Sequence, residues 1–282
     1  MGPAIFSGES GSSGSLIGIN ATLSEITTTS YVSSNIAAGS TVVLTGALSV
    51  AAANNTRQRA DSDSNTGALI AAGASVADLS STSYTYARVA NDVKIVAGGM
   101  DVSASSTDDN SGIADAGSGG VLAGAGARVT TINHSTTEAT VGSGTDDRGA
   151  NIAGEAAITA GHTAIFNGNI TTFGGGALSG SGARVTHDVV SDVLAEASAG
   201  ADISAEKIDI TATNSLDKNN GGISSVVGGA LAGAGSSSDI DIDINTQANV
   251  GDYADLDVVG SRFKPGDLTV SAKNSLKVYD KT

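Results

Sequence analysis

A glycine-rich word returns at a nearly fixed interval along the chain. Its clearest copies read GALIAAGASV, GVLAGAGARV, GGALSGSGARV and GALAGAGSSS, and GSLIGINATL is a weaker copy. The repeat glycines are spaced by 53, 53, 56 and 53 residues. They are Gly14, Gly67, Gly120, Gly176 and Gly229. A period of this length indicates equivalent structural units that stack on one another.

Three apolar columns recur once in each of the five units. A leucine stands two residues after each repeat glycine, and we expect this leucine column to be buried. A second word, such as EKIDITATN, carries a Val/Ile column and an Ala column that we expect to stack from unit to unit. The leucines are Leu16, Leu69, Leu122, Leu178 and Leu231. The other two columns are Val50, Val102, Ile158, Ile210 and Val270, and Ala52, Ala104, Ala160, Ala212 and Ala272.

A polar column follows four residues after the Val/Ile column. It consists of Asn54, Ser106, His162, Asn214 and Asn274. These side chains could form a ladder of hydrogen bonds between neighbouring coils, or they could be solvated residues of a turn. The sequence leaves both interpretations open.

Local patterns favour strands over helices. KIDITAT, DLTVSAK and DIDIDIN alternate apolar and polar residues, which is typical of half-buried strands. The content of aromatic residues is only 3%, with no Trp, so the side chains available can fill only a thin core. Segments 61–65, 107–112, 145–149 and 217–222 are rich in Asp, Asn and Gly, and predict turns.

These observations predict an all-β protein, a right-handed parallel β-helix (β-solenoid) built from five repeats of about 53 residues. Two coils per repeat is the favoured arrangement, and three coils remain possible. A propeller would also fit the period, but the aromatic residues that wedge between blades are missing. The glycine-rich word is then a buried strand and corner where backbones approach closely. The repeats are 14–66, 67–119, 120–175, 176–228 and 229–282, after a leader or cloning-derived segment at 1–13.

The charge balance narrows the range of partners. The formal net charge is −15, which disfavours binding to nucleic acid and to anionic membranes. No apolar stretch is long enough to predict a membrane span. The chain has no Cys, so no disulfide framework is expected.

The repeated words resemble those of large secreted bacterial adhesins of the filamentous haemagglutinin-like and leukotoxin-type filamentous adhesin families. The resemblance covers residues 14–282 and rests on the GGALAGAGA-type words, the A-x-V words at 139–141 and 248–250, and the GDLTVSAKN-type words. It implies a parallel β-helix shaft that is extracellular or displayed at the bacterial cell surface. It also implies that the chain is an internal segment of a larger protein.

Candidate chemical groups are few. His134, His162 and His187 fall at different phases of the repeat, and we expect them to be exposed or at strand edges. Asp188 and Asp192 near Arg184 are the residues that a polysaccharide-cleaving β-helix would use. Similar charges occur on any solvated sheet, so we expect no enzyme.

An acidic strand is the one candidate metal site. In SSSDIDIDIN, alternation places Asp239, Asp241 and Asp243 on one face of a strand. A Ca²⁺ ion could relieve the repulsion between these carboxylates. No other cofactor is expected.

The sequence therefore predicts a structural shaft segment of a secreted adhesin or extracellular filament that provides reach and rigidity for attachment. Its partners would be neighbouring repeats or identical chains stacked end to end. A host-cell or matrix receptor or a glycan is a further possible partner. The alternative is a β-helical protein that binds or cleaves carbohydrate, for which the aromatic candidates are Tyr84, Tyr86, Phe166, Phe173, Tyr253 and Phe263.

Overall fold

The computed structural model describes residues 4–145, 148–218, 221–260 and 265–279. The regular structure of these residues consists of strands alone, and they contain no helix that could cross a bilayer. The larger sheet contains β1 (Ala4–Ile36), β3 (Ala47–Val89), β5 (Gly99–Gly119), β6 (Leu122–Val141), β8 (Glu155–Gly175), β9 (Leu178–Ala197), β11 (Lys207–Lys218), β12 (Gly222–Gly228), β13 (Leu231–Val250) and β15 (Asp267–Val278). The smaller sheet contains β2 (Thr41–Val43), β4 (Lys94–Ala97), β7 (Ala150–Ile152), β10 (Asp202–Ala205) and β14 (Asp255–Val258).

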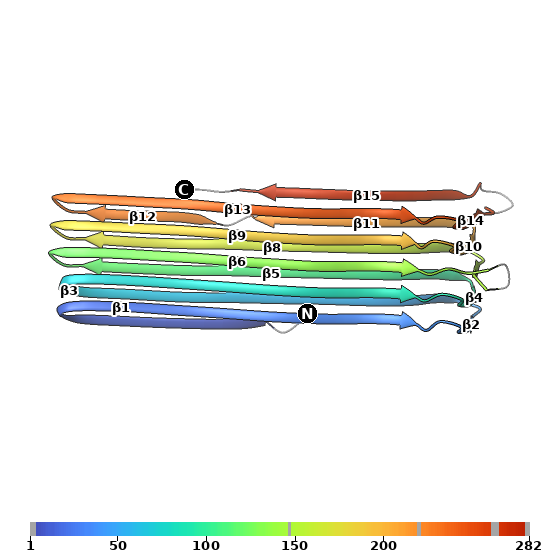
Figure 1. Cartoon of the computed structure of the whole chain (residues 1–282), viewed down its shortest axis with the longest axis horizontal. Helices are drawn as coiled ribbons and strands as arrows, with labels where there is room; N and C mark the ends of the chain where they lie inside the picture. Colours follow the sequence, from blue (N-terminus) through green and yellow to red (C-terminus); the bar gives the residue numbers. More distant parts are fainter. Residues whose placement is uncertain (1–3, 146–147, 219–220, 261–264, 280–282) are drawn as a thin grey trace.

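The chain winds as a flattened coil whose long strands run along the longest axis of the molecule (Figure 1). In each coil the chain runs along one long strand, reverses direction at a corner, and returns along a second long strand. The outgoing layer contains the first halves of β1 and β3, then β5, β8, β11 with β12, and β15. The returning layer contains the second halves of β1 and β3, then β6, β9 and β13. The short strands form the smaller sheet at the end opposite the corners (Figure 1).

Neighbouring strands in both sheets are parallel, and partner residues lie a full repeat apart. Val50 pairs with Val102, and Val102 pairs with Ile158, so these partners are 52 and 56 residues apart. The predicted all-β, parallel, solenoid-like arrangement is confirmed. The expectation of two coils per repeat is wrong, because a half-repeat coil would pair residues about half as far apart. Residues 4–13, set apart in the sequence as a leader, pair with 57–66 in the larger sheet.

The interior lies between the outgoing and returning layers. Along β8, side chains that are buried alternate with side chains that are partly or fully exposed over nearly the whole strand. The first four members of both the Val/Ile column and the Ala column are buried and stack in register, as predicted. Because most inward side chains are small, the two layers can pack closely along their entire length.

The leucine column is exposed, which corrects the prediction of burial. Leu122 is 43% exposed and Leu178 is 52% exposed. These leucines sit at the corner where the chain reverses, and no opposite layer lies there to cover them. The stacking also differs by one residue, because Ile70, rather than Leu69, pairs with Leu122.

The repeat glycines at three corners are required by close backbone approach. A Cβ atom on Gly176 would collide with the carbonyl oxygen of Gly120, and one on Gly229 would collide with that of Gly176. Gly120 is confined in the same way by the carbonyl oxygen of Ala68. The sequence therefore correctly predicted a corner with close backbone contact. The prediction that the glycine-rich word is buried is wrong at this corner, where Ala177 and Leu178 are exposed.

Two of the predicted turns are strand segments instead. Residues 61–65 lie in β3, and 107–112 lie in β5. Their polar residues alternate between the outer surface and the interior, where Ser62 and Asp108 are fully buried. The predicted turn at 145–149 lies between β6 and β7, whereas the one at 217–222 overlaps the end of β11 and the start of β12. Residues 146–147 and 219–220 lie outside the described part of the chain.

Candidate functional sites

The polar column is a buried hydrogen-bonded ladder. Asn54, Ser106, His162 and Asn214 are each at most 8% exposed. They face a column of serines on the returning layer, which consists of Ser30, Ser83, Ser135 and Ser191. The facing pairs are joined by hydrogen bonds of 2.9 Å (Ser30–Asn54), 3.4 Å (Ser83–Ser106), 3.2 Å (Ser135–His162) and 2.9 Å (Asn214–Ser191). Of the two interpretations that the sequence left open, the ladder is therefore correct for these four residues, whereas Asn274, the fifth member of the column, is exposed.

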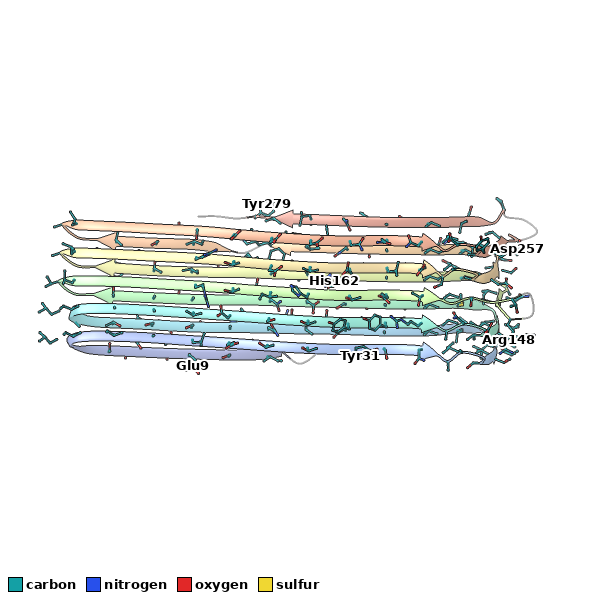
Figure 2. All side chains as sticks on the ribbon, viewed as in Figure 1. Glu9, Tyr31, Arg148, His162, Asp257 and Tyr279 are labelled. Carbon is teal, nitrogen blue, oxygen red and sulfur yellow. The ribbon has the colours of Figure 1, made fainter. Side chains whose placement is uncertain are left out.

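The centre of this ladder holds a buried carboxylate and a buried imidazole. Asp108 Oδ2 lies 3.0 Å from His162 Nε2 and accepts a hydrogen bond of 2.8 Å from Ser83. Asp108 Oδ1 accepts a hydrogen bond from Thr56. His162 Nδ1 lies 2.7 Å from Ser191 Oγ. His162 is near the middle of the long strands (Figure 2).

Hydrogen bonds link a serine, a histidine and an aspartate here, as they do in a hydrolase triad, but the geometry of this group is that of a structural contact. In hydrolases the aspartate bonds Nδ1 and the serine bonds Nε2, and here the two nitrogens are exchanged. Ser191 and Asp108 are 0% exposed, so a substrate carbonyl cannot reach the hydroxyl. What the residues can do is satisfy a buried charge, because three donors surround one carboxylate.

The three histidines occupy different environments. The prediction of exposed positions holds for His134, whose side chain is 46% exposed and lies 3.5 Å from Asp188. It is wrong for His162 and for His187, which is fully buried, lies beside the ring of Phe166 and contacts Thr131 at 2.5 Å. Alternate residues of a strand point to opposite faces, so the odd or even position of each histidine along its strand decides whether it faces the interior or the solvent. The prediction of exposure did not use this alternation.

The acidic strand lies on the outer surface of the returning layer. Asp239, Asp241 and Asp243 are exposed, and the intervening isoleucines point inward, so the predicted alternation is correct. Asp239 lies 3.4 Å from Arg184, and Asp241 pairs across the strands with Asp188. Within the described ranges no three ligating side chains gather as a metal site. Ca²⁺ binding at this strand stays a prediction.

Most ion pairs join neighbouring coils rather than forming a pocket. Arg57–Asp109, Arg88–Glu138 and Arg128–Asp78 span 2.9, 2.5 and 2.7 Å between adjacent strands. Their side chains are partly exposed, so each pair adds little stability alone. Arg184 and Asp188 take part in the same pattern, and together with Asp192 they lie on the flat outer surface of β9.

One surface cluster has perturbed ionisation. The ammonium group of Lys207 contacts Asp209 and lies 3.1 Å from Glu155. Hydrogen bonds to Asp209 and then to Glu155 raise the pKa of Lys207. Burial acts to raise the pKa of Asp209, but hydrogen bonds from Lys207 and Thr269 outweigh it and the net pKa is lowered. The cluster links β8, β11 and β15 along the stacking direction.

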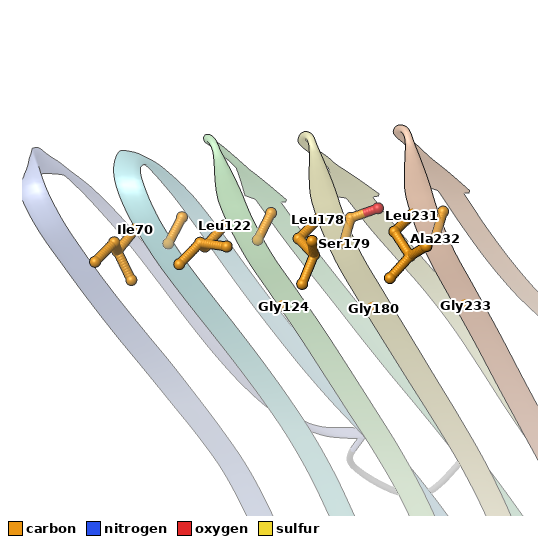
Figure 3. Close-up of a pocket in the computed structure, with 11 residues that line it drawn as sticks. Ile70, Leu122, Gly124, Leu178, Ser179, Gly180, Leu231, Ala232 and Gly233 are labelled. Atoms are coloured by element: carbon orange, nitrogen blue, oxygen red, sulfur yellow. The ribbon is translucent and has the colours of Figure 1, made fainter.

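The exposed corner residues form an aliphatic row. Ile70, Leu122, Leu178 and Leu231 stack in register over four coils. They line an open hollow of about 620 Å³ with small residues of the glycine-rich words, including Gly124 and Gly180 (Figure 3).

The aromatic candidates separate into different places. Phe166 is buried, Phe173 and Tyr253 are exposed, and Phe263 lies outside the described residues. Tyr84 and Tyr86 come together with Tyr31, which the sequence reasoning did not single out. The period could have found it, because Tyr31 and Tyr84 are 53 residues apart and pair across β1 and β3. Burial, followed by the charge of Glu138, raises the pKa of Tyr86.

Comparisons of this chain with protein-family models, with curated proteins and with solved structures find no match.

Proposed function

We propose that this chain is a shaft segment of an extracellular filament or surface adhesin. Its fold would be a right-handed β-solenoid of five repeats with one coil each. The observation that carries the proposal is the in-register parallel pairing that continues from β1 through β3, β6 and β9 to β13. Backbone hydrogen bonds then run along the stacking axis, so that load on the axis is shared by strands of 20 residues in each coil.

The role as a bacterial secreted adhesin rests on the resemblance of the repeated words. The buried Asp108–His162–Ser191 group supports a structural interpretation, because its hydrogen bonds hold three strands together and leave no reactive group open to solvent. We assign the chain no catalytic reaction.

β13 is the last strand at one edge of the larger sheet, and this edge favours partners that stack along the axis of the coil. Ile240, Ile242 and Ile244 are only partly buried, whereas their partners in β9, which are His187, Val189 and Ser191, are 0% exposed. A further coil placed on β13 would bury these isoleucines and pair the free strand edge. That coil would come from neighbouring repeats or from an identical chain.

Electron microscopy of a concentration and salt series tests axial assembly. We expect thin fibres that lengthen as salt screens the net charge of −15. Ile242→Asp should abolish the fibres, and Asp241→Asn, on the outward side of the same strand, should keep or lengthen them. Monomeric particles under all conditions would exclude self-assembly and leave neighbouring repeats as the partners.

A further inference from the structure

Three of the five tyrosines gather on the outer surface of the returning layer. Tyr31 lies on β1 (Figure 2), and Tyr84 and Tyr86 lie on β3. The ring centroid of Tyr31 is 6.5 Å from that of Tyr84 and 5.5 Å from that of Tyr86. The rings of Tyr84 and Tyr86 are stacked, with an angle of 17° between their planes. The rings therefore form one continuous aromatic surface.

Sheet stability alone does not account for this cluster. Cross-strand aromatic pairs do stabilise sheets, but they gain most when the rings are covered. Here Tyr31 remains 65% exposed and Tyr84 remains 37% exposed. Ring surface that stays in contact with water is available to a ligand.

Polar groups border the rings. Next to Tyr31 and Tyr86 is a hollow of about 420 Å³, whose lining includes Asn35, Asn91 and Thr140. Amides and hydroxyls of this kind can donate and accept hydrogen bonds without adding charge. The site thus combines rigid aromatic area with adaptable polar groups, a combination that recurs in recognition surfaces.

The charges at the cluster cancel. The Arg88 guanidinium lies 4.1 Å from the centroid of the Tyr86 ring, and it forms a 2.5 Å ion pair with Glu138. The cluster therefore offers no free cation to an anionic ligand, and the net charge of the chain repels anions further. A ligand that suits this surface is uncharged, has hydroxyl groups, and has an apolar face that can stack on a ring.

We propose that Tyr31, Tyr84 and Tyr86 form a binding platform for a neutral oligosaccharide. The C–H face of a pyranose ring would stack on the tyrosines, and its hydroxyls would bond Asn35, Thr140 and the phenol groups. The platform is open and shallow, so it suits an extended chain of sugars. This inference does not depend on the shaft proposal, because a shaft without a glycan site and a glycan-binding monomer are both physically possible.

Tyrosine fluorescence offers a direct test, since the chain has no Trp. The full chain is titrated with soluble cello-, chito- and manno-oligosaccharides, and with sulfated and sialylated glycans for comparison. We expect saturable changes in emission with at least one neutral series. Response to anionic glycans only, or to no glycan at millimolar concentration, would overturn the proposal.

Variants locate the site. Tyr31→Ala and Tyr84→Ala should each weaken binding at least tenfold, whereas Tyr253→Ala, which removes a 96% exposed tyrosine far from the cluster in the sequence, should leave it unchanged. Tyr31→Phe retains the ring and should keep most of the affinity, which covers the case of an alanine variant that fails to fold. Equal binding by Tyr31→Ala, Tyr253→Ala and the unmodified chain would show that the sugar binds elsewhere.

Discussion

His162 Nε2 and Asp108 Oδ2 lie 3.0 Å apart between the two layers, and neither side chain is exposed to solvent. The two residues come from neighbouring outgoing strands, β8 and β5. A carboxylate only accepts hydrogen bonds, so His162 donates to it through Nε2. The pair lies inside a core of aliphatic and polar side chains in which Phe166, His187 and Lys218 are also fully buried.

Replacing His162 with Ala should destabilise the fold by about 3–5 kcal/mol, because Asp108 would keep a buried charge with one partner fewer. Chemical denaturation measures the loss. His134→Ala is the control and should cost about 0–1 kcal/mol, since its contact with Asp188 is exposed. The double variant Asp108→Ala/His162→Ala should recover part of the loss, and strictly additive effects would contradict the coupling.

Ile158 and Leu178 should respond in opposite ways to the same substitution. Ile158→Asp places a charge at a fully buried position and should cost several kcal/mol. Leu178→Asp lies at the exposed corner and should change the free energy of unfolding by about 0.5 kcal/mol or less. Thermal melts of the two variants would reveal an error in the assigned interior if their losses were equal.

Gly176→Ala should destabilise the protein by about 1–3 kcal/mol, because its methyl group would meet the carbonyl oxygen of Gly120 in the adjacent coil. Gly182→Ala, in the same glycine-rich word, meets no atom within 4 Å and should be neutral or slightly stabilising. Denaturant midpoints of the pair provide the measurement. A neutral Gly176→Ala would show that the corner has room to relax.

The Lys207–Asp209 contact should stabilise the fold in a pH-dependent way. The folded-state pKa of Asp209 is lowered, so its contribution is present above the unfolded-state value of about 4 and is lost as pH falls through the folded-state value. The folded-state pKa of Lys207 is raised, so its contribution is lost only as pH rises through that value. A double-mutant cycle with Lys207→Met and Asp209→Asn should show coupling at pH 7 and weaker coupling at pH 2, because the carboxyl of Asp209 is protonated as pH falls through its lowered pKa. Equal coupling at both pH values would exclude an ionic origin.

The sequence allowed the strand architecture to be predicted because its columns are also the columns of the structure. Val102 and Ile158 stand at equivalent repeat positions and are hydrogen-bonded neighbours. The number of coils could not be obtained in this way, since a period fixes the spacing of equivalent residues but not how often the chain reverses between them. The burial of Leu178 was mispredicted because a repeated leucine shows only that positions are equivalent, and a corner repeats as regularly as a core.

Whether a candidate site residue is buried follows from its odd or even position along a strand, and local composition alone gave the wrong answer. Asp108 and Asn110 were assigned to a turn because Asp and Asn are common there, yet both occupy inward positions of β5. Counting in steps of two from Val102 reaches both residues and places them in the interior. The same counting from Ser83 and Tyr84 separates a buried serine from an outward tyrosine.

One coil per repeat also has a consequence for the speed and order of folding. Residues that become neighbours on adjacent strands, such as Val50 and Val102, are 52 positions apart. No backbone hydrogen bond between these strands can therefore form until a long loop has closed. The length-dependent part of that closure alone costs about 3.5 kcal/mol. The first two coils must pay it without support, while every later coil closes against an edge that already exists. Folding should therefore begin slowly at one pair of coils and then advance one repeat at a time, with each finished strand acting as the template for the next.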